Sequence, residues 1–352
     1  WVDRRRDHGG VIFIDLRDHT GIIQVVFNPD NKETFNKAQA LRTEYVLKIT
    51  GKIKKRLEGT TNSDMSTGEI ELVAEDIEIF NSSKTPPFKV NDAAINEDLR
   101  LKYRYIDLRG QNMQENLRFR SKLYNTIRNH LCDNDFNEIE TPILTKPTPE
   151  GARDYIVPSR IHKTKFFALP QSPQLFKQIL MISGLDKYFQ IAKCFRDEDL
   201  RADRQPEFTQ LDIECSFYDE ENIIELSESL MRKIFRDLID DELVLDFPRI
   251  SYSDVMQKYG CDKPDLRNPL HLVEISSLLE KTEFKVFKDS ISNPKCRIVA
   301  LNVPGGNQLS RNNIDQYTEL VKSFGAKGLA YFKVDNIDNL PSGVSSPISK
   351  FL

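Results

Sequence analysis

The chain contains, at residues 195–208, the segment FRDEDLRADRQPEF. Apolar and polar side chains alternate on both sides of it, and this period-2 pattern predicts strands over 188–196 and 207–218, joined by a charged loop. Strands that follow one another directly in this way pair antiparallel. We therefore expect an antiparallel sheet flanked by helices. The helices are predicted from apolar periodicity at 113–131, 174–183 and 220–239.

Residues 1–80 have the pattern of a small barrel. Alternation over Val11–Asp18 and Ile23–Phe27 predicts two strands, which place Phe13 and Gln24 on the faces opposite to the apolar side chains. Further strands are expected at 45–53 and 69–80, a short helix at 33–43, and a Gly/Thr/Asn/Ser-rich loop at 59–68. This combination is typical of an OB-fold, a five-stranded barrel that binds oligonucleotides.

Composition excludes several classes of protein. The 352 residues carry a net charge of −4, without a run of 18 apolar residues and without an apolar leader, so we expect a cytoplasmic protein that does not cross a membrane. The five cysteines have no C-x-x-C spacing, which predicts free, buried thiols rather than a zinc or redox site. Residues 1–60 hold 12 Lys+Arg against 8 Asp+Glu, a net +4, and the runs Arg4–Arg6 and Lys52–Arg56 are by themselves more typical of a solvated surface than of a nucleic-acid site.

Changes of pattern along the chain divide it into parts, and the fold class we predict is a multidomain α+β protein. From about Asp265, turn signals and helical stretches at 270–281 and 312–324 alternate with short strands, which indicates a small α/β module. The predicted parts are a barrel at 1–85, a linker at 86–102, a sheet domain at 103–266 and the α/β module at 267–352.

Polar side chains are most concentrated between residues 150 and 212. Arg196 would offer a rigid, permanently charged fork to a phosphate, with Glu198 on the same face of the strand, and Phe208 could stack on a nucleobase. Gln174 and Lys177 lie one helical turn apart, on one face. Neither a P-loop nor a G-x-G-x-x-G motif offers another nucleotide site. Without context, a salt-bridged hairpin with a core phenylalanine is the better explanation of the strand–loop–strand.

FRDEDLRADRQPEF resembles motif 2 of class II aminoacyl-tRNA synthetases. TPEGARDY and ALPQSPQLFKQ are similar to the aspartyl branch, WVDRRRDHGGVIFIDLRD to its anticodon-binding OB domain, and YGCDKPDLR and GAKGLAYFKV to the insertion of bacterial-type members. The resemblance covers nearly the whole chain. It implies a ligase that activates L-aspartate with ATP to aspartyl-adenylate and transfers it to the 3′-terminal adenosine of tRNA-Asp.

The resemblance also implies roles for single residues. Arg196 would be the catalytic arginine, which contacts the ATP α-phosphate and the aspartate carboxylate. The ATP site would further contain Glu198, Gln205 and Phe208. Aspartate would be bound by Glu150, Gln174, Lys177 and Asp212, and Lys177 would pair with the side-chain carboxylate. Because asparagine would leave Lys177 buried and unpaired, we expect strong discrimination against it.

The anticodon would be read on the barrel by Phe13, Gln24 and Glu71, an aromatic platform with hydrogen-bonding groups. Arg6 and the other basic residues would meet phosphates. His8 and Gly59 resemble the relaxed form of the enzyme, which also charges tRNA-Asn; a solvated His and a Gly that only breaks a loop explain them equally well. The helix at 113–131 and a strand at 137–144 that includes Pro142 match motif 1, which implies a homodimer.

One departure from the family pattern concerns the third motif, which supplies an arginine for the ATP γ-phosphate. The sequence has no counterpart, and it ends inside the insertion, so we expect a truncated chain with impaired activity. The ligands of the Mg²⁺ that accompanies ATP are expected in the missing part. An asparaginyl- or lysyl-tRNA synthetase and a non-catalytic tRNA-binding fragment stay open as alternatives.

Overall fold

A computed structural model describes residues 1–243, 247–339 and 342–349. The chain divides into two compact units, residues 1–244 and 245–352. The first unit contains the barrel and the sheet that sequence patterns predict. The second contains the small α/β module.

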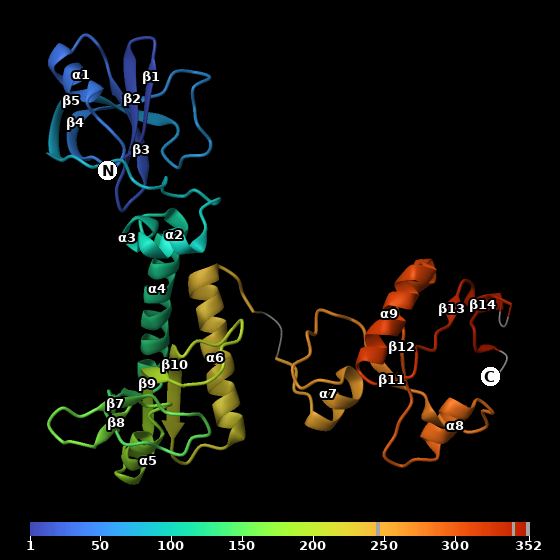
Figure 1. Ribbon diagram of the computed structural model, residues 1–352. Helices are drawn as coiled ribbons and strands as arrows, with labels where there is room; N and C mark the ends of the chain where they lie inside the picture. The colour runs from blue at the N-terminus through green and yellow to red at the C-terminus, as the bar shows by residue number, and fades with distance from the viewer. Residues whose placement is uncertain (244–246, 340–341, 350–352) are drawn as a thin grey trace. The chain divides into compact units, whose positions relative to one another are not determined.

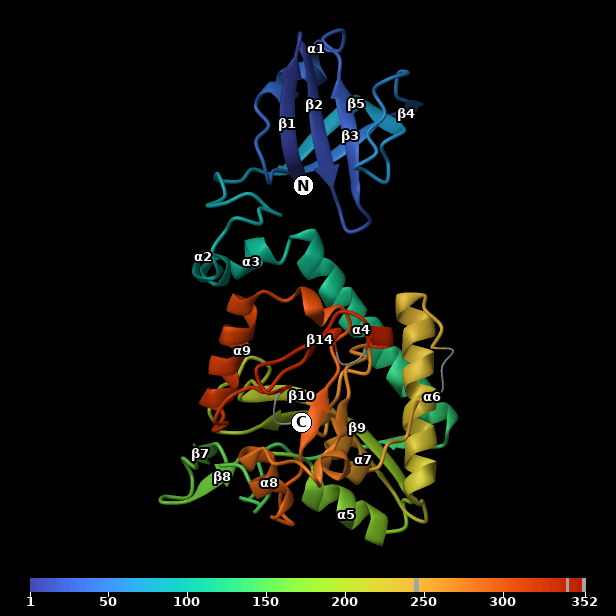
Figure 2. The ribbon, with the colours of Figure 1, turned by 90° about the vertical axis from the view of Figure 1, so that its right-hand side faces the viewer.

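A five-stranded barrel begins the first unit (Figures 1 and 2), with the strand order β1-β2-β3-β5-β4. Parallel pairing of β3 with β5 joins two sets of antiparallel strands. The core consists of apolar side chains that include Ile12, Ile14 and Val25. The OB-fold prediction is thereby confirmed. The elements are β1 (Val2–His8), β2 (Val11–Arg17), β3 (Ile22–Phe27), α1 (Lys32–Gln39), β4 (Val46–Lys55) and β5 (Ile70–Asn81).

Strand β1 was missed in the sequence, because its charged residues hide the apolar alternation. Val2 is fully buried, whereas Arg6 lies opposite Phe13 on the outer side of the ladder. The basic run Arg4–Arg6 is therefore part of an edge strand. Charged side chains on such a strand oppose pairing with another chain.

The second sheet of this unit, which follows the barrel, has the order β10-β9-β6, and two long helices cover one of its faces (Figure 1). Strands β9 (Lys187–Phe195) and β10 (Glu207–Cys215) pair antiparallel, as expected. Helices α4 (Gln111–Asp133) and α6 (Glu220–Ile239) also confirm the predicted periodicity. Their buried core with the sheet contains Ile127, Leu131, Phe136, Phe189, Leu226 and Leu230.

Several details differ from the sequence prediction. The strand expected at 137–144 is only β6 (Asn137–Glu138), an edge strand that runs parallel to β9. Pro142 lies beyond the ladder, since proline has no N–H to donate to it. Leu117 of α4 is 52% exposed, although the helical spacing would place it on the apolar face. Further elements of this unit are α2 (Glu97–Lys102), α3 (Arg104–Asp107), β7 (Ile156–Pro158), β8 (Phe166–Ala168) and α5 (Gln174–Ile182).

The second unit is built from short elements. Helix α9 (Arg311–Ser323) confirms the prediction at 312–324, but the helix predicted at 270–281 is wrong. Strand β11 (Leu272–Glu274) pairs there with β12 (Val299–Leu301), because tertiary pairing overrides a weak helical pattern. The other elements are α7 (Tyr252–Tyr259), η1 (Ser276–Leu279), α8 (Lys285–Ile291), η2 (Gly306–Gln308), β13 (Lys333–Val334), η3 (Ile337–Asn339) and β14 (Val344–Ser345).

The boundary between the two compact units lies near residue 244, whereas the change in the sequence pattern lies near residue 266. Helix α7 belongs to the second unit, because Arg297 donates hydrogen bonds to the carbonyls of Met256 and Gln257 at 3.2 and 3.0 Å. The domain boundary between 266 and 267 therefore stays a prediction.

All five cysteines are free thiols. Cys194 is buried, but Cys132, Cys261 and Cys296 are exposed, so the expectation of buried thiols is wrong for these three. Burial raises the pKa of the Cys194 thiol to about 11. Among the described residues, no helix is long and apolar enough to cross a bilayer.

A buried carboxylate closes one end of the barrel. The Glu44 side chain, 4% exposed, accepts hydrogen bonds from Arg17 at 2.9 and 3.0 Å and from Arg109 at 2.5 Å. Arg17 also pairs with Asp3. A carboxylate that has left water is stabilised only if such partners replace the lost hydration.

We expect Glu44→Gln to lower the free energy of unfolding by about 3 kcal/mol, since it leaves a mostly buried Arg17 without its main counter-charge. Urea denaturation followed by Trp1 fluorescence measures this, because Trp1 is the single tryptophan of the sequence and its carbonyl accepts from the Arg17 N–H at 2.8 Å. Glu33→Gln is the control: its pair with Lys37 is exposed, and its loss should cost less than about 0.5 kcal/mol. Equal effects of the two changes would refute the proposed difference.

Candidate functional site

Strands β9 and β10 give the sheet one apolar and one polar face. Directly paired residues point to the same side, so the apolar pairs Phe189–Ile213 and Ile191–Leu211 face α4 and α6. The intervening pairs then face the other side. They are Tyr188–Glu214, Gln190–Asp212, Ala192–Gln210 and Cys194–Phe208. This second face carries the residues that the resemblance assigned to chemistry.

Helix α5 places a lysine against the polar face. Lys177 Nζ lies 2.9 Å from Asp212 Oδ1 and 3.2 Å from Glu214 Oε2, and its side chain is 11% exposed. Burial lowers the pKa of Lys177, but the two carboxylates raise it by more, so the ammonium stays charged. Burial raises the pKa of the Asp212 carboxyl, against the effect of Lys177. Asp212 Oδ2 is buried. The Tyr188 hydroxyl is close enough to lower the pKa of the Asp212 carboxyl, but it donates at 2.9 Å to Gln190 Oε1, so that Oδ2 has no hydrogen-bond donor among the described residues.

This geometry corrects our argument about discrimination. Lys177 does not depend on a substrate carboxylate for a partner, because Asp212 and Glu214 already pair with it. An ammonium has three N–H donors, so one donor is left for a ligand. The amide oxygen of asparagine could also accept from this donor. A preference for aspartate would then come from the full negative charge of its carboxylate, and not from an unpaired lysine.

The Gly-containing loop and the start of α5 meet beside Lys177. Glu150 accepts hydrogen bonds from Thr148 Oγ1 at 2.8 Å and from Ser172 Oγ at 2.5 Å. Gln171 is 1% exposed and connects the backbone of Ala152 with the Asp154 side chain. Sequence reasoning missed Gln171 and Ser172 as site residues, although both stand in the quoted segment ALPQSPQLFKQ.

Gln174 is half-buried in the first turn of α5, three residues before Lys177 and so on the same helical face. Glu150 is bonded to Ser172 just before α5, and Lys177, on the same helical face as Gln174, pairs with Asp212. That these four residues form one site stays a prediction. What they bind stays a prediction.

A separate pocket of about 350 Å³ lies at the loop between β9 and β10. The guanidinium carbon of Arg196 lies 5.0 Å from the ring centroid of Phe208, and the Arg196 N–H donates to the Pro206 carbonyl at 2.9 Å. The residues predicted for ATP all line this pocket: Arg196, Glu198, Gln205 and Phe208.

One detail of that prediction was wrong. Strand β9 ends at Phe195, so Arg196 and Glu198 do not share a strand face. Glu198 lies in the loop, 3.7 Å from Arg204 across an exposed ion pair. The loop conformation, rather than strand alternation, brings Glu198 to the pocket.

On the barrel, the residues predicted to read the anticodon form a hydrogen-bonded row. Arg6 donates to Asp15 at 2.9 and 2.5 Å and to Gln24 Oε1 at 3.2 Å. Gln24 Nε2 in turn donates to Glu71 Oε2 at 3.0 Å. Both ends of the Gln24 amide are therefore held. Asp15, which we did not predict, fixes Arg6 from a buried position, with 8% exposure.

The aromatic part of this surface lies next to the row. The rings of His8 and Phe13 are in edge contact, with centroids 6.2 Å apart. Gly59 stands in the loop after β4 at φ +80°, with open space where a Cβ would be. This φ favours glycine whatever the neighbours, so the backbone alone accounts for Gly59.

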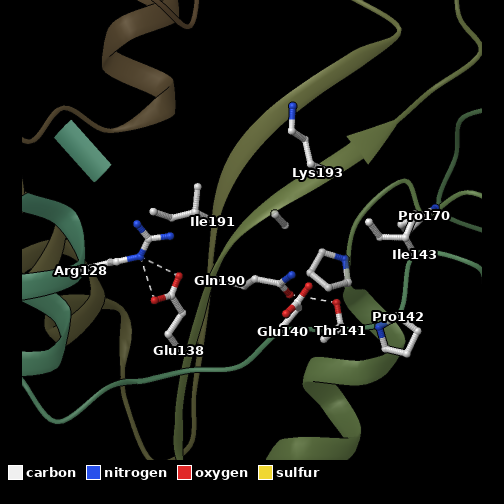
Figure 3. A pocket seen from close by; sticks show the side chains of 12 residues that line it. Arg128, Glu138, Glu140, Thr141, Pro142, Ile143, Pro170, Gln190, Ile191 and Lys193 are labelled. Atoms are coloured by element: carbon white, nitrogen blue, oxygen red, sulfur yellow. Dashed lines mark hydrogen bonds and ion pairs between the residues drawn. The ribbon is translucent and has the colours of Figure 1, made fainter. Parts of the chain in front are cut away.

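Another pocket, of about 430 Å³, lies at the edge of the sheet around β6 (Figure 3). Arg128 donates to both oxygens of Glu138, and Thr141 donates to Gln190 at 2.9 Å. Pro142 lines the same pocket, but none of the residues predicted for ATP or aspartate does. In the described part of the chain, no three His, Cys, Asp or Glu side chains are grouped as metal ligands.

Two family models match the chain. Residues 1–80 match the OB-fold nucleic acid binding domain, and residues 96–333 match the tRNA synthetases class II (D, K and N). A domain similar to the OB-fold nucleic acid binding domain therefore precedes a class II synthetase sheet. The chain belongs to the class II tRNA synthetase (D, K and N) family.

Solved structures of both aspartyl and asparaginyl enzymes are similar to the chain. The "putative aspartyl-tRNA synthetase" from Leishmania major Friedlin is 26% identical, with a TM-score of 0.60 over 68% of this chain and 48% of its own. Asparaginyl-tRNA synthetase from Pyrococcus horikoshii, complexed with asparaginyl-adenylate, is 27% identical, with a TM-score of 0.63 over 75% and 64%. The chain thus spans between about half and two thirds of the length of these relatives.

Proposed function

We propose that the protein is an aspartate–tRNA ligase of the cytoplasm. It would activate L-aspartate with ATP and transfer the aspartyl group to the 3′-terminal adenosine of tRNA-Asp. Family membership supports the ligase class, and the surroundings of Lys177 support the choice of aspartate.

The observation that carries the choice of substrate is the pairing of Lys177 with an incompletely bonded Asp212. The third Nζ donor of Lys177 would bind the side-chain carboxylate of aspartate, and the unpartnered Asp212 Oδ2 would accept from its α-ammonium. Glu150 would add negative charge toward the same ammonium. The ammonium of a lysine side chain has no acceptor for the third Nζ donor of Lys177, so it could not replace the aspartate carboxylate there.

In the activation step, an oxygen of the aspartate α-carboxylate attacks the α-phosphorus of ATP, and pyrophosphate leaves. Arg196 would neutralise charge on the α-phosphate and orient the attacking carboxylate. Phosphoryl-group chemistry is catalysed mainly by such positioning and charge neutralisation. In the transfer step, a ribose hydroxyl of the tRNA attacks the activated carbonyl, and AMP leaves.

ATP–pyrophosphate exchange on the full-length protein with aspartate, asparagine and lysine tests the substrate. We expect exchange with aspartate alone. Exchange with asparagine instead would establish the alternative that the Pyrococcus relative suggests, an asparaginyl enzyme. No exchange with any of the three would favour a tRNA-binding protein without catalysis.

Lys177→Ala should lower aspartate-dependent exchange at least a hundredfold while ATP binding survives, because the pocket around Arg196 and Phe208 does not include Lys177. Equilibrium dialysis with ATP and exchange kinetics measure the two effects separately. Lys193→Ala is the matched control, since this exposed lysine points to the opposite side of β9. Wild-type exchange by the Lys177 variant would refute its role in the pocket.

We also propose that the barrel reads the anticodon and that His8 permits relaxed recognition, so that tRNA-Asn is charged as well. The two anticodons differ at the third base, C against U, and an imidazole can donate to or accept from either. Charging of both tRNAs, side by side with the intact enzyme, tests this. Charging of tRNA-Asp alone would refute relaxed recognition and leave the ligase proposal intact.

A homodimer is the proposed assembly, formed through α4 and the segment around Pro142. This segment follows the edge strand β6, whose outer backbone N–H and C=O groups have no partner strand among the described residues. A pocket of about 430 Å³ lies at the same edge of the sheet. Sedimentation of the full-length protein at micromolar concentration should give twice the monomer mass. A monomer would contradict the assignment.

A further inference from the structure

The hairpin β7–β8 ends in a cationic tip, residues 159–165, with the sequence SRIHKTK. Arg160, Lys163 and Lys165 are exposed, and the tip contains no carboxylate. In both ribbon views the connection between the strands projects away from its neighbours (Figures 1 and 2). These three cations form no ion pair within the part of the chain that the structure describes. Three unneutralised charges therefore stand together on one projection.

The tip has a fixed conformation rather than that of a loose loop. The Ser159 hydroxyl accepts from the His162 N–H at 3.0 Å, and Ser159 N–H donates to the Lys165 carbonyl at 2.9 Å. Lys165 N–H donates to the His162 carbonyl at 3.1 Å, and Thr164 has φ 64°. A turn that is ordered in advance loses less conformational entropy when it binds a ligand.

Apolar side chains accompany the cations. Ile161 at the tip is 80% exposed. Below it, register pairs Pro158 with Phe166 and Ile156 with Ala168, so these side chains share one face, on which Phe166 is 55% exposed. Cations beside exposed aromatic and aliphatic surface suit unpaired nucleotides, whose phosphates need charge and whose bases need a flat apolar contact.

The base of the hairpin leads directly into the amino-acid region. Leu169 N–H donates to the Tyr155 carbonyl at 2.9 Å, Gln171 then bonds to Asp154, and Ser172 bonds to Glu150. The three residues of β7 separate Tyr155 from the tip, a reach of about 10 Å. A ligand on the tip would therefore lie beside the pocket in which aspartyl transfer is proposed.

We propose that this hairpin binds the unpaired 3′ end of the tRNA, with Arg160, Lys163 and Lys165 on its phosphates and Phe166 against a base. The inference rests on the proposed ligase function, since that reaction requires a tRNA 3′ end at Glu150 and Arg196. An acidic protein would also be attracted by the three charges, but it would not need the exposed ring of Phe166.

The test compares the triple variant Arg160→Ala, Lys163→Ala, Lys165→Ala with wild type, in the full-length protein. The ligand is an acceptor-stem minihelix that has its single-stranded 3′ end but no anticodon. The dissociation constant should rise about tenfold, and the slope of log affinity against log salt should fall by about 2, since each phosphate contact of a single strand contributes about 0.7. With a minihelix that lacks the unpaired 3′ nucleotides, variant and wild type should bind equally.

Two further variants separate binding from folding and from general charge. Arg160→Lys, Lys163→Arg, Lys165→Arg keeps the charges and should bind as wild type. Lys285→Ala, Lys288→Ala, Lys295→Ala removes three exposed charges from the second unit and should leave the salt slope unchanged. Aspartate-dependent pyrophosphate exchange should be unaffected in all variants.

The proposal is overturned if the tip variant binds the complete minihelix as wild type does, if the loss persists with the blunt minihelix, or if the second-unit variant loses as much. A parallel loss of exchange would likewise overturn it, because the hairpin would then act only by supporting the pocket. Wild-type exchange with asparagine instead of aspartate would refute the proposed substrate but would leave this comparison intact.

Discussion

The antiparallel ladder between β9 and β10 is the constraint on which the first unit depends. Nine consecutive residue pairs, from Phe195–Glu207 to Cys215–Lys187, fix a register without a bulge. A slip by one residue would turn the apolar set toward solvent and the charged set into the core. The same register therefore determines the packing against α4 and α6 and the grouping of Phe208, Asp212 and Glu214 on the opposite face.

The buried charged side chains of the barrel and of the β10-β9-β6 sheet differ in how completely they are paired. In the barrel, Glu44 is surrounded by arginines, and its oxygens accept from Arg17 and Arg109. On the sheet, Lys177 is outnumbered by carboxylates, and one oxygen of Asp212 accepts nothing from the described residues. The first arrangement is complete as it stands and suits a structural role. In the arrangement around Lys177, one carboxylate oxygen can still accept a hydrogen bond, which suits a cationic group of a ligand.

Local sequence patterns predicted the helices and strands that have distinct apolar and polar faces. They failed for elements whose conformation depends on contacts with distant parts of the chain. The spacing of Gln174 and Lys177 and the periodicity of α6 could be read directly. The register could not, so the contact of Lys177 with Asp212 and Glu214 was not foreseen. Strand β1 was hidden because Arg6 is stabilised by Asp15 on another strand. The hairpin β7–β8 and strand β11 were missed for the same reason, since three-residue strands carry almost no periodicity and depend on partners elsewhere.

The unpartnered oxygen of Asp212 has a consequence for the energetics of the whole unit. A buried acceptor without a donor costs roughly 1–3 kcal/mol, and this one lies in the region proposed to receive a substrate. A ligand that donates to this oxygen removes that cost in the folded chain only, because the unfolded chain exposes the carboxylate to water. Ligand binding and folding are then thermodynamically linked. The unpartnered oxygen lowers the free energy of unfolding of the ligand-free protein and raises its affinity for the ligand.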